Sequence, residues 1–358
     1  MISFFNLRWC LLFLALAPQL FVRARLVGHR ATTEASTKTA ANAVDTSSSC
    51  RAASEQDAEL LLSKEFMIHK VHVATHLSDI VNREEYGRIE DMIDEQRKVF
   101  ERFDGFHDYN DQSLVAKTKD TQTCFVTFQS TDPGNGVVAF LMDQWQNVNP
   151  FKVRIGTSDC YARKGYVNAY NASSYKDEQR KSIDACVASC GDTPCPLVLS
   201  GFSQGGSAAV VAAADLAHYN PEVITFGAAR VIVDRDNAPC TESINPANHY
   251  RFVTADTATG YDAIPNQINV WNERHVGHFF LLDADGDNLP LNMPSMDDNV
   301  SRRPRTLDMH DFVLYRERIE ALLESDCFPL AVAKWSVGHY CRYDDECSSE
   351  SCVEFACA

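Results

Sequence analysis

Residues 196–219 read PLVLSGFSQGGSAAVVAAADLAHY and place a G-x-S-x-G pattern between two predicted elements. The apolar run that ends at Ser200 is typical of a buried strand, and the Ala-rich run after Gly206 is typical of a helix. Small residues on both sides of Ser203 allow a sharp turn between a strand and a helix that approach each other closely. Such a turn exposes the serine hydroxyl, and the N-terminus of the helix favours negative charge beside it. The stretch therefore predicts that Ser203 is a nucleophile.

The surrounding sequence alternates between short apolar runs and helical stretches. Predicted strands cover residues 124–128, 197–199, 223–226, 250–253 and 279–282. Predicted helices lie around residues 57–103, 137–147, 175–190 and 205–218. Short apolar strands that alternate with helices indicate an α/β fold, with a mostly parallel central sheet and helices on both faces.

The N-terminal region has the features of a secretory signal peptide over residues 1–24. Arg8 precedes a short apolar run, and a loose A-x-A pattern ends at Ala24. The run is too short to cross a bilayer. Residues 25–56 are rich in Ser, Thr and Ala, which predicts a linker or a pro-segment. We therefore expect a secreted protein with no transmembrane segment in the mature chain and a main domain over residues 57–330.

The cysteines fit an oxidising compartment. Of the 13 cysteines, Cys10 lies in the predicted signal, and the remaining even number suits disulfides. An acidic, Cys-rich tail at residues 335–358 is too small to bury a core, so we expect disulfides to hold it. A binding role and a purely structural role are both open for this tail. Asn171 and Asn299 begin N-x-S sequons and are candidate glycosylation sites.

The charge balance excludes one class of partner. With 33 basic and 49 acidic residues, the formal net charge is −16. Such a surface repels phosphate groups, so a nucleic-acid partner is not expected. The sequence leaves the oligomeric state open.

Two patterns resemble metal sites, and each has a simpler interpretation. His69, His72 and His76 share one face of a predicted helix, but no carboxylate or cysteine motif accompanies them. Residues 283–294 resemble a calcium loop, although Asn288 and Pro294 stand where an EF-hand needs glycine and glutamate. Packed or exposed histidines and a solvated acidic loop are the favoured interpretations. We expect no metal and no organic cofactor.

A serine nucleophile needs a histidine to accept its proton and a carboxylate to orient that histidine. In α/β hydrolases the acid and then the histidine follow the serine along the chain. Six histidines follow Ser203: His218, His249, His275, His278, His310 and His339. The pattern of residues alone does not choose among them.

Several segments, in order, resemble motifs of the class 3 lipase family of α/β hydrolases. The segments are LVLSGFSQGGSAAVVAAADL around Ser203, VITFGAARV (223–231), YRFV (250–253) with DAIP (262–265), HVGHFFLLD (275–283) and HDFVLY (310–315). They are similar to the family's G-H-S-L-G-G turn, V-T-F-G-x-P-R-V strand and loop, Y-R-V-V strand with D-x-V-P acid loop, H-V-G-x-E strand and H-x4-Y motif. The resemblance covers residues from about 120 to 322.

The resemblance implies an α/β-hydrolase fold and a triad of Ser203, Asp262 and His310. Asp256 is the alternative acid, because it lies nearer to the end of the predicted strand, where the family's acid usually sits. Asp262 needs a short insertion but keeps the D-x-hydrophobic-Pro context. For His275 and His278, which alternate along a predicted strand, we expect a structural role.

The resemblance also implies an oxyanion hole built from the backbone amides of Thr131 and Gln204. Phe128-Gln-Ser-Thr131 resembles the family's F-R-G-[ST], and Gln204 directly follows the nucleophile. Four residues depart from the family's pattern: Gln129 in place of Arg, Ser130 in place of Gly, and Arg163 and Phe202 each in place of His. These departures concern fine geometry and substrate choice rather than the type of reaction.

Residues 132–146, which include many apolar side chains, occupy the position of the lid in the resembled lipases. A mobile lid that opens at a lipid surface and an ordinary packed helix are both open. The resemblance implies a secreted serine carboxylic-ester hydrolase, a lipase that cleaves acylglycerol esters at a lipid–water interface through an acyl-enzyme. The alternatives are a feruloyl or cutinase-like esterase, a phospholipase and, from another class, a non-catalytic secreted binding protein on a hydrolase scaffold.

Overall fold

The computed structural model describes most of the predicted main domain. The described residues are 67–82, 92–107, 112–130, 151–171, 175–233, 240, 244–256, 260–266, 273–283, 305–306, 309–324, 352–353 and 356–357. The predicted signal peptide, the Ser/Thr/Ala-rich segment, the candidate lid, Thr131, Asn299 and all but the first residue of the acidic loop at 283–294 lie outside these residues. Most of the Cys-rich tail also lies outside them.

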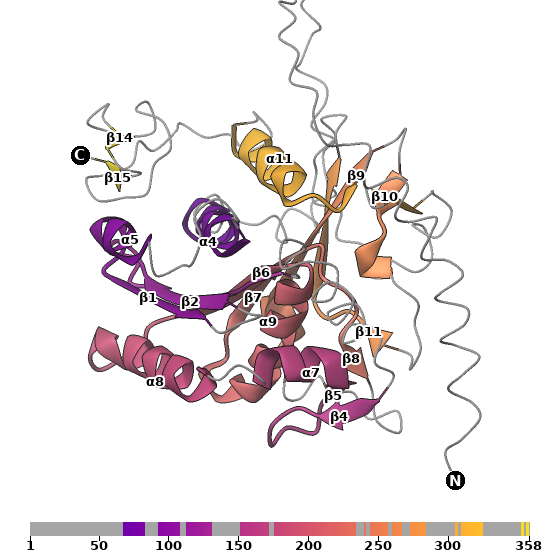
Figure 1. Cartoon of the computed structure of the whole chain (residues 1–358), viewed down its shortest axis with the longest axis horizontal. Helices are drawn as coiled ribbons and strands as arrows, with labels where there is room; N and C mark the ends of the chain where they lie inside the picture. Colours follow the sequence, from indigo (N-terminus) through magenta and orange to yellow (C-terminus); the bar gives the residue numbers. More distant parts are fainter. Residues whose placement is uncertain are drawn as a thin grey trace, which may run out of the picture. The chain divides into compact units, whose positions relative to one another are not determined.

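A nine-stranded sheet is the centre of the described part of the chain (Figure 1). Its strands are β1 (Arg102–His107), β2 (Gln112–Lys117), β3 (Cys124–Phe128), β6 (Leu197–Phe202), β7 (Glu222–Phe226), β9 (His249–Asp256), β10 (Gly260–Asp262), β12 (His278–Asp283) and β13 (Arg305–Thr306). Strands β3, β6, β7, β9 and β12 pair in parallel, in that order across the sheet. These are the five strands that the sequence predicts, and the predicted α/β-hydrolase fold with its mostly parallel sheet is confirmed.

Helices cover both faces of the sheet (Figure 1). Helices α7 (Lys164–Asn171), α8 (Lys176–Val187) and α9 (Gln204–Asp215) pack on one face, and α4 (Val73–Asn82), α5 (Ile93–Val99) and α11 (Phe312–Glu324) pack on the other. The strands supply both cores because successive side chains point to opposite faces. In β6, for example, Leu197 and Leu199 pack with α9, whereas Val198 and Phe202 pack with α11.

Short elements complete the described chain. A π-helix, η2 (Met67–His72), precedes α4, and 3₁₀ turns are η6 (Ala188–Cys190), η7 (Ala217–Tyr219), η9 (Pro246–Asn248) and η10 (Ile264–Asn266). A second sheet contains β4 (Lys152–Arg154), β5 (Tyr161–Arg163), β8 (Ile232–Val233) and β11 (Glu273–Arg274). In the tail, β14 (Cys352–Val353) pairs with β15 (Ala356–Cys357) in an antiparallel hairpin. Strands β1 and β2 and the sheet of β4, β5, β8 and β11 are not predicted from the sequence.

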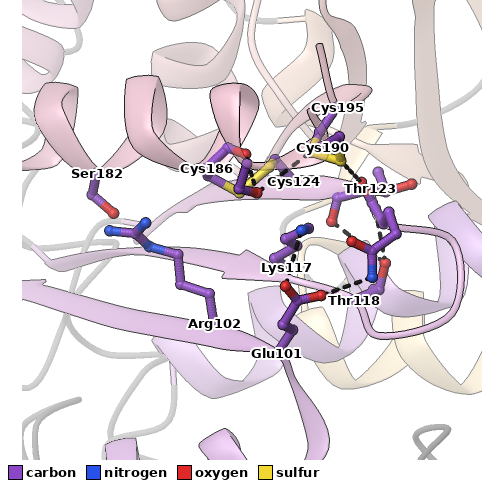
Figure 2. Close-up of a disulfide and its surroundings, with 12 residues drawn as sticks. Glu101, Arg102, Lys117, Thr118, Thr123, Cys124, Ser182, Cys186, Cys190 and Cys195 are labelled. Carbon is purple, nitrogen blue, oxygen red and sulfur yellow. Dashed lines mark hydrogen bonds and ion pairs between the residues drawn. A yellow bond between two sulfur atoms is a disulfide. The ribbon is translucent and has the colours of Figure 1, made fainter. Parts of the chain in front are cut away.

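Three disulfides among the described residues support the prediction of paired cysteines. They join Cys124 to Cys186, Cys160 to Cys240 and Cys190 to Cys195. The first ties the start of β3 to the last turn of α8, beside the bond between Cys190 and Cys195 (Figure 2). Near these bonds the buried Lys117 Nζ lies 3.0 Å from Glu101 Oε1, which compensates the ammonium charge (Figure 2).

Candidate active site

Ser203 occupies the tight turn that the sequence predicts between β6 and α9. Its backbone has φ +54° and ψ −120°, a strained conformation for a residue with a side chain. The flanking glycines are required by close approach, because a Cβ on Gly201 would lie 2.4 Å from the carbonyl carbon of Gly205. A Cβ on Gly205 would lie 2.2 Å from the carbonyl oxygen of Phe128. The turn therefore holds Ser203 at the carboxyl end of the parallel strands.

His310 reaches this serine from the loop that precedes α11. Its Nε2 lies 2.7 Å from Ser203 Oγ, although 107 positions separate the two residues in the chain. The ring of Phe202 stacks on the imidazole, with centroids 4.6 Å apart and an interplanar angle of 25°. The aromatic residue at the family's histidine position thus limits how the His310 ring can turn.

Asp262 lies behind His310 because a β-hairpin returns it toward the serine. Strand β9 runs to Asp256, which pairs with Gly260, and β10 then runs back alongside β9. At the end of β10, Asp262 Oδ2 lies 2.7 Å from His310 Nδ1. The short insertion noted in the sequence is this hairpin. Because of this hairpin, Asp262 contacts His310. Asp256, six positions earlier, is the last residue of β9.

The carboxylate of Asp262 is fully buried and accepts three hydrogen bonds. Besides His310, Tyr315 Oη donates to Oδ2 at 2.5 Å, and the Ile264 amide donates to Oδ1 at 2.8 Å. Burial and the nearby charge of Asp262 raise the pKa of Tyr315 well above its usual value, so its phenol keeps its proton and remains a donor. A buried carboxylate needs such donors, since an uncompensated buried charge is unfavourable.

The structure describes one of the two predicted oxyanion residues, Gln204. Gln204 is the first residue of α9, where the helix dipole favours negative charge, whereas Thr131 lies outside the described residues. The segment that leads to Thr131 contacts the first turn of α9, as the approach of Phe128 to Gly205 shows. Asn82, at the end of α4, accepts a hydrogen bond from the Ser130 amide at 2.7 Å. No role for Asn82 or Tyr315 is predicted from the sequence, because each acts through a contact distant in the chain. Ile264 acts on Asp262, two residues before it, through its backbone amide, which leaves no mark in a residue pattern.

Two other predicted positions have structural partners. Arg163, which replaces the family's histidine, is buried and donates from Nε to Glu273 Oε1 at 2.6 Å. Burial is the largest single influence on the pKa of Arg163 and would lower it, but the hydrogen bond to Glu273 and the electrostatic interactions with Tyr166 and Glu273 together raise it. His275 Nε2 lies 2.7 Å from the carbonyl oxygen of Pro265, in the turn that follows Asp262. His275 therefore supports the acid loop, and His278 stacks on Tyr250.

The remaining predictions concern glycosylation, metal binding and membrane spans. Asn171 is exposed at the end of α7. Among the described residues, no group of three or more histidine, cysteine or acidic side chains is arranged to hold a metal ion, and His69 pairs with Asp120 at 3.2 Å. No helix in the described part of the chain is long and apolar enough to cross a membrane.

Comparison with known proteins decides the family of the catalytic segment. The model of the family Lipase (class 3) matches residues 125–266, from β3 to η10, and this segment includes Ser203 and Asp262. This segment belongs to the class 3 lipase family. The resemblance predicted from the sequence is confirmed, and with it the prediction of a serine ester hydrolase. His310 lies beyond the matched residues.

Solved structures share the fold at low sequence identity. A variant of the MDLA protein from Penicillium cyclopium has a TM-score of 0.50 and 16% identity, covering 72% of this chain and 97% of its own. A deletion mutant of the Rhizomucor miehei lipase–propeptide complex has a TM-score of 0.51 and 15% identity, covering 74% of this chain and 81% of its own. A triacylglycerol lipase described as having a serine protease triad as its catalytic centre has a TM-score of 0.50 and 16% identity, covering 73% and 95%. A search of curated proteins found no match.

Proposed function

We propose that this class 3 lipase-family protein hydrolyses carboxylic esters through Ser203, His310 and Asp262. The observation that carries the proposal is the continuous path of hydrogen bonds from Ser203 Oγ through the imidazole of His310 to Asp262 Oδ2, with both links at 2.7 Å. A serine hydroxyl becomes a useful nucleophile when a positioned imidazole accepts its proton.

In the first half of the reaction, Ser203 Oγ bonds to the ester carbonyl carbon while its proton moves to His310 Nε2. The carbonyl oxygen becomes an oxyanion, which the amides of Gln204 and Thr131 stabilise. When the tetrahedral intermediate collapses, the bond to the alcohol breaks and His310 gives its proton to the departing alcohol. Water then attacks the acyl-enzyme with His310 as base again, releasing the carboxylic acid and restoring Ser203.

Asp262 orients His310 and supports the positive charge that develops on its ring. We assign this role to Asp262 rather than to Asp256. The Asp262→Asn substitution should lower kcat about 10⁴-fold, because an amide cannot enforce the required tautomer. The matched Asp256→Asn substitution should leave kcat within about threefold of the unsubstituted protein, which is less than one kcal/mol of barrier. The reverse pattern would transfer the acid role to Asp256.

For the substrate, we propose acylglycerol esters taken at a lipid–water interface. The support is the family of the catalytic segment and the apolar residues at 132–146, next to the oxyanion segment. Feruloyl or cutinase-like esters and phospholipids are the alternatives. The test measures hydrolysis of a long-chain triglyceride emulsion, a phospholipid and a feruloyl ester by the protein and by Ser203→Ala. A higher kcat/KM on the phospholipid or the feruloyl ester than on the triglyceride would reject the lipase assignment.

A non-catalytic binding protein on a hydrolase scaffold is the candidate from another class, and the absence of Ser203-dependent hydrolysis from all three substrates would favour it. We further propose secretion, with residues 1–24 as signal peptide and 25–56 as linker or pro-segment. The three disulfides fit an oxidising compartment, and Asn171 is exposed and open to glycosylation. Asn299 is the second proposed glycosylation site.

A further inference from the structure

Thr254 lies at the point where β9 extends beyond its neighbour in the sheet. Strand β7 ends at Phe226, which is paired with Phe252, and the chain turns away at Gly227. Two residues further along β9, Thr254 shares the face of Phe252 and is fully buried. It therefore lies at the carboxyl end of the parallel strands, the end that also carries Ser203.

The hydroxyl of Thr254 holds the residue before His310. It donates to the carbonyl oxygen of Met309 at 2.5 Å across 55 positions of the chain. The other side of His310 is fixed differently, because Arg318 Nη1 on α11 donates to the carbonyl oxygens of Ala255 and Leu282. Helix α11 is thus fastened to the sheet without Thr254, whereas the backbone immediately before His310 is held by the threonine hydroxyl.

Thr254 also lies next to the acid of the triad. The antiparallel register of β9 and β10 pairs Asp256 with Gly260 and Ala255 with Tyr261, so the next position in the register places Asp262 opposite Thr254. A hydrogen bond from the backbone of Thr254 also acts on Tyr315, where it partly offsets the rise of the phenol pKa caused by burial and by Asp262. Thr254 therefore contacts both Met309, which precedes His310, and Tyr315, which donates a hydrogen bond to Asp262.

We propose that Thr254 is a positioning residue for the triad, whose hydroxyl fixes the Met309 carbonyl and thereby places the His310 ring between Ser203 and Asp262. This inference rests on the proposed hydrolase activity. It concerns the rate of the chemical step rather than substrate binding, since Thr254 is fully buried behind the triad. Small displacements of a catalytic group lower the rate strongly without changing the affinity for substrate.

The test compares Thr254→Val, which removes the hydroxyl at nearly constant volume, with Thr254→Ser, which retains it. The matched control is Thr225→Val, because Thr225 is a buried threonine on β7 whose hydroxyl has no hydrogen-bond partner within the described structure. For each variant the measurements are kcat and KM on p-nitrophenyl butyrate, the rate of fluorophosphonate labelling of Ser203, and Tm. Thr254→Ala gives the same comparison if Thr254→Val does not fold.

We expect Thr254→Val to lower kcat and the labelling rate about tenfold, with KM within about twofold. Thr254→Ser should restore most of kcat, and Thr225→Val should match the unsubstituted protein. An active protein whose kcat is unchanged in Thr254→Val would overturn the inference alone. Equal losses in Thr254→Ser and Thr254→Val would also overturn it, since they would assign the effect to packing. If the unsubstituted protein lacked Ser203-dependent hydrolysis, this inference and the proposed function would fall together.

Discussion

Tyr315 and His310 bind the same oxygen of Asp262, with Tyr315 Oη at 2.5 Å and His310 Nδ1 at 2.7 Å from Oδ2. The two donors come from one segment of the chain, because α11 begins two residues after His310. The helix therefore supplies both the histidine loop and a second anchor for the acid. This arrangement ties the orientation of the carboxylate to the packing of α11 against the sheet.

The first prediction concerns the phenol of Tyr315. Tyr315→Phe removes one donor from a buried carboxylate, and a hydrogen bond to a charged group contributes about 1.5–3 kcal/mol. We expect kcat on p-nitrophenyl butyrate to fall about tenfold as Asp262 loses its fixed orientation. The control is Tyr170→Phe, which removes a similar bond to Asp215 Oδ2 at 2.9 Å, on the opposite face of the sheet. Equal kcat in the two variants would show that Tyr315 does not support the acid.

The second prediction concerns Gly227, at the end of β7. It has φ +60°, and a Cβ there would lie 2.8 Å from Asp262 Oδ2 and 3.1 Å from His310 Cε1. Gly227→Ala should therefore displace the acid and the histidine and lower kcat at least about 100-fold. Gly191→Ala is the matched control, because Gly191 has φ +79° but no atom within 4 Å of the added Cβ. Both variants carry backbone strain, so a similar loss of activity in both would contradict the steric explanation.

The third prediction concerns the buried ion pair of Arg163 and Glu273. Removing one partner by Arg163→Met takes the guanidinium away from the buried Glu273 carboxylate and should lower the free energy of unfolding by about 3–5 kcal/mol. Replacing both partners, with Arg163→Met and Glu273→Leu, should lower the free energy of unfolding less than Arg163→Met alone. Urea denaturation gives the free energy of unfolding of the unsubstituted protein, the single variant and the double variant. The exposed pair of Arg154 and Asp159 provides the control, and Arg154→Met should cost less than about 1 kcal/mol.

The fourth prediction is a loss of stability in acid that comes from His249. Burial, followed by the charges of Arg251 and His278, lowers the pKa of His249 to about 3. Below pH 6.5 the unfolded chain binds a proton at this histidine and the folded chain does not, so stability falls as the pH decreases from 6.5 toward 3. The contribution is at most about 1.4 kcal/mol per pH unit.

Urea denaturation between pH 7 and pH 4 measures this slope. In His249→Gln the slope should be shallower by about 1 kcal/mol per pH unit. His218→Gln, at an exposed histidine, serves as the control and should leave the slope unchanged. An unchanged slope in His249→Gln would show that this buried imidazole does not govern acid unfolding.

The elements of the fold that the sequence predicts best are those with strong local signals. The strand before Ser203 begins with three apolar residues and is buried throughout, and small residues surround the serine. Strand β1, with Arg102, Asp104 and Gly105 in its sequence, has no such pattern, and it becomes a strand through pairing with β2. The strands of the second sheet, with two or three residues each, are too short to give a periodic signal.

The residues of the site also differ in how well the local sequence predicts them. The nucleophile follows from its local context, but residues alone do not choose His310 among six histidines, since that choice depends on a contact across 107 positions. Asp256 and Asp262 are both consistent with the sequence until the β9–β10 hairpin is known. Thr254 and Asn82 act through a backbone carbonyl and a backbone amide, which leave no mark in a residue pattern.

The proposed function depends on Ser203 being a nucleophile that His310 activates. Its most direct test is the reaction of the folded protein with a fluorophosphonate, with the labelled peptide located by mass spectrometry. We expect stoichiometric labelling at Ser203, abolished by Ser203→Ala and strongly slowed by His310→Gln. Labelling at another serine, or no labelling of correctly folded protein, would contradict it.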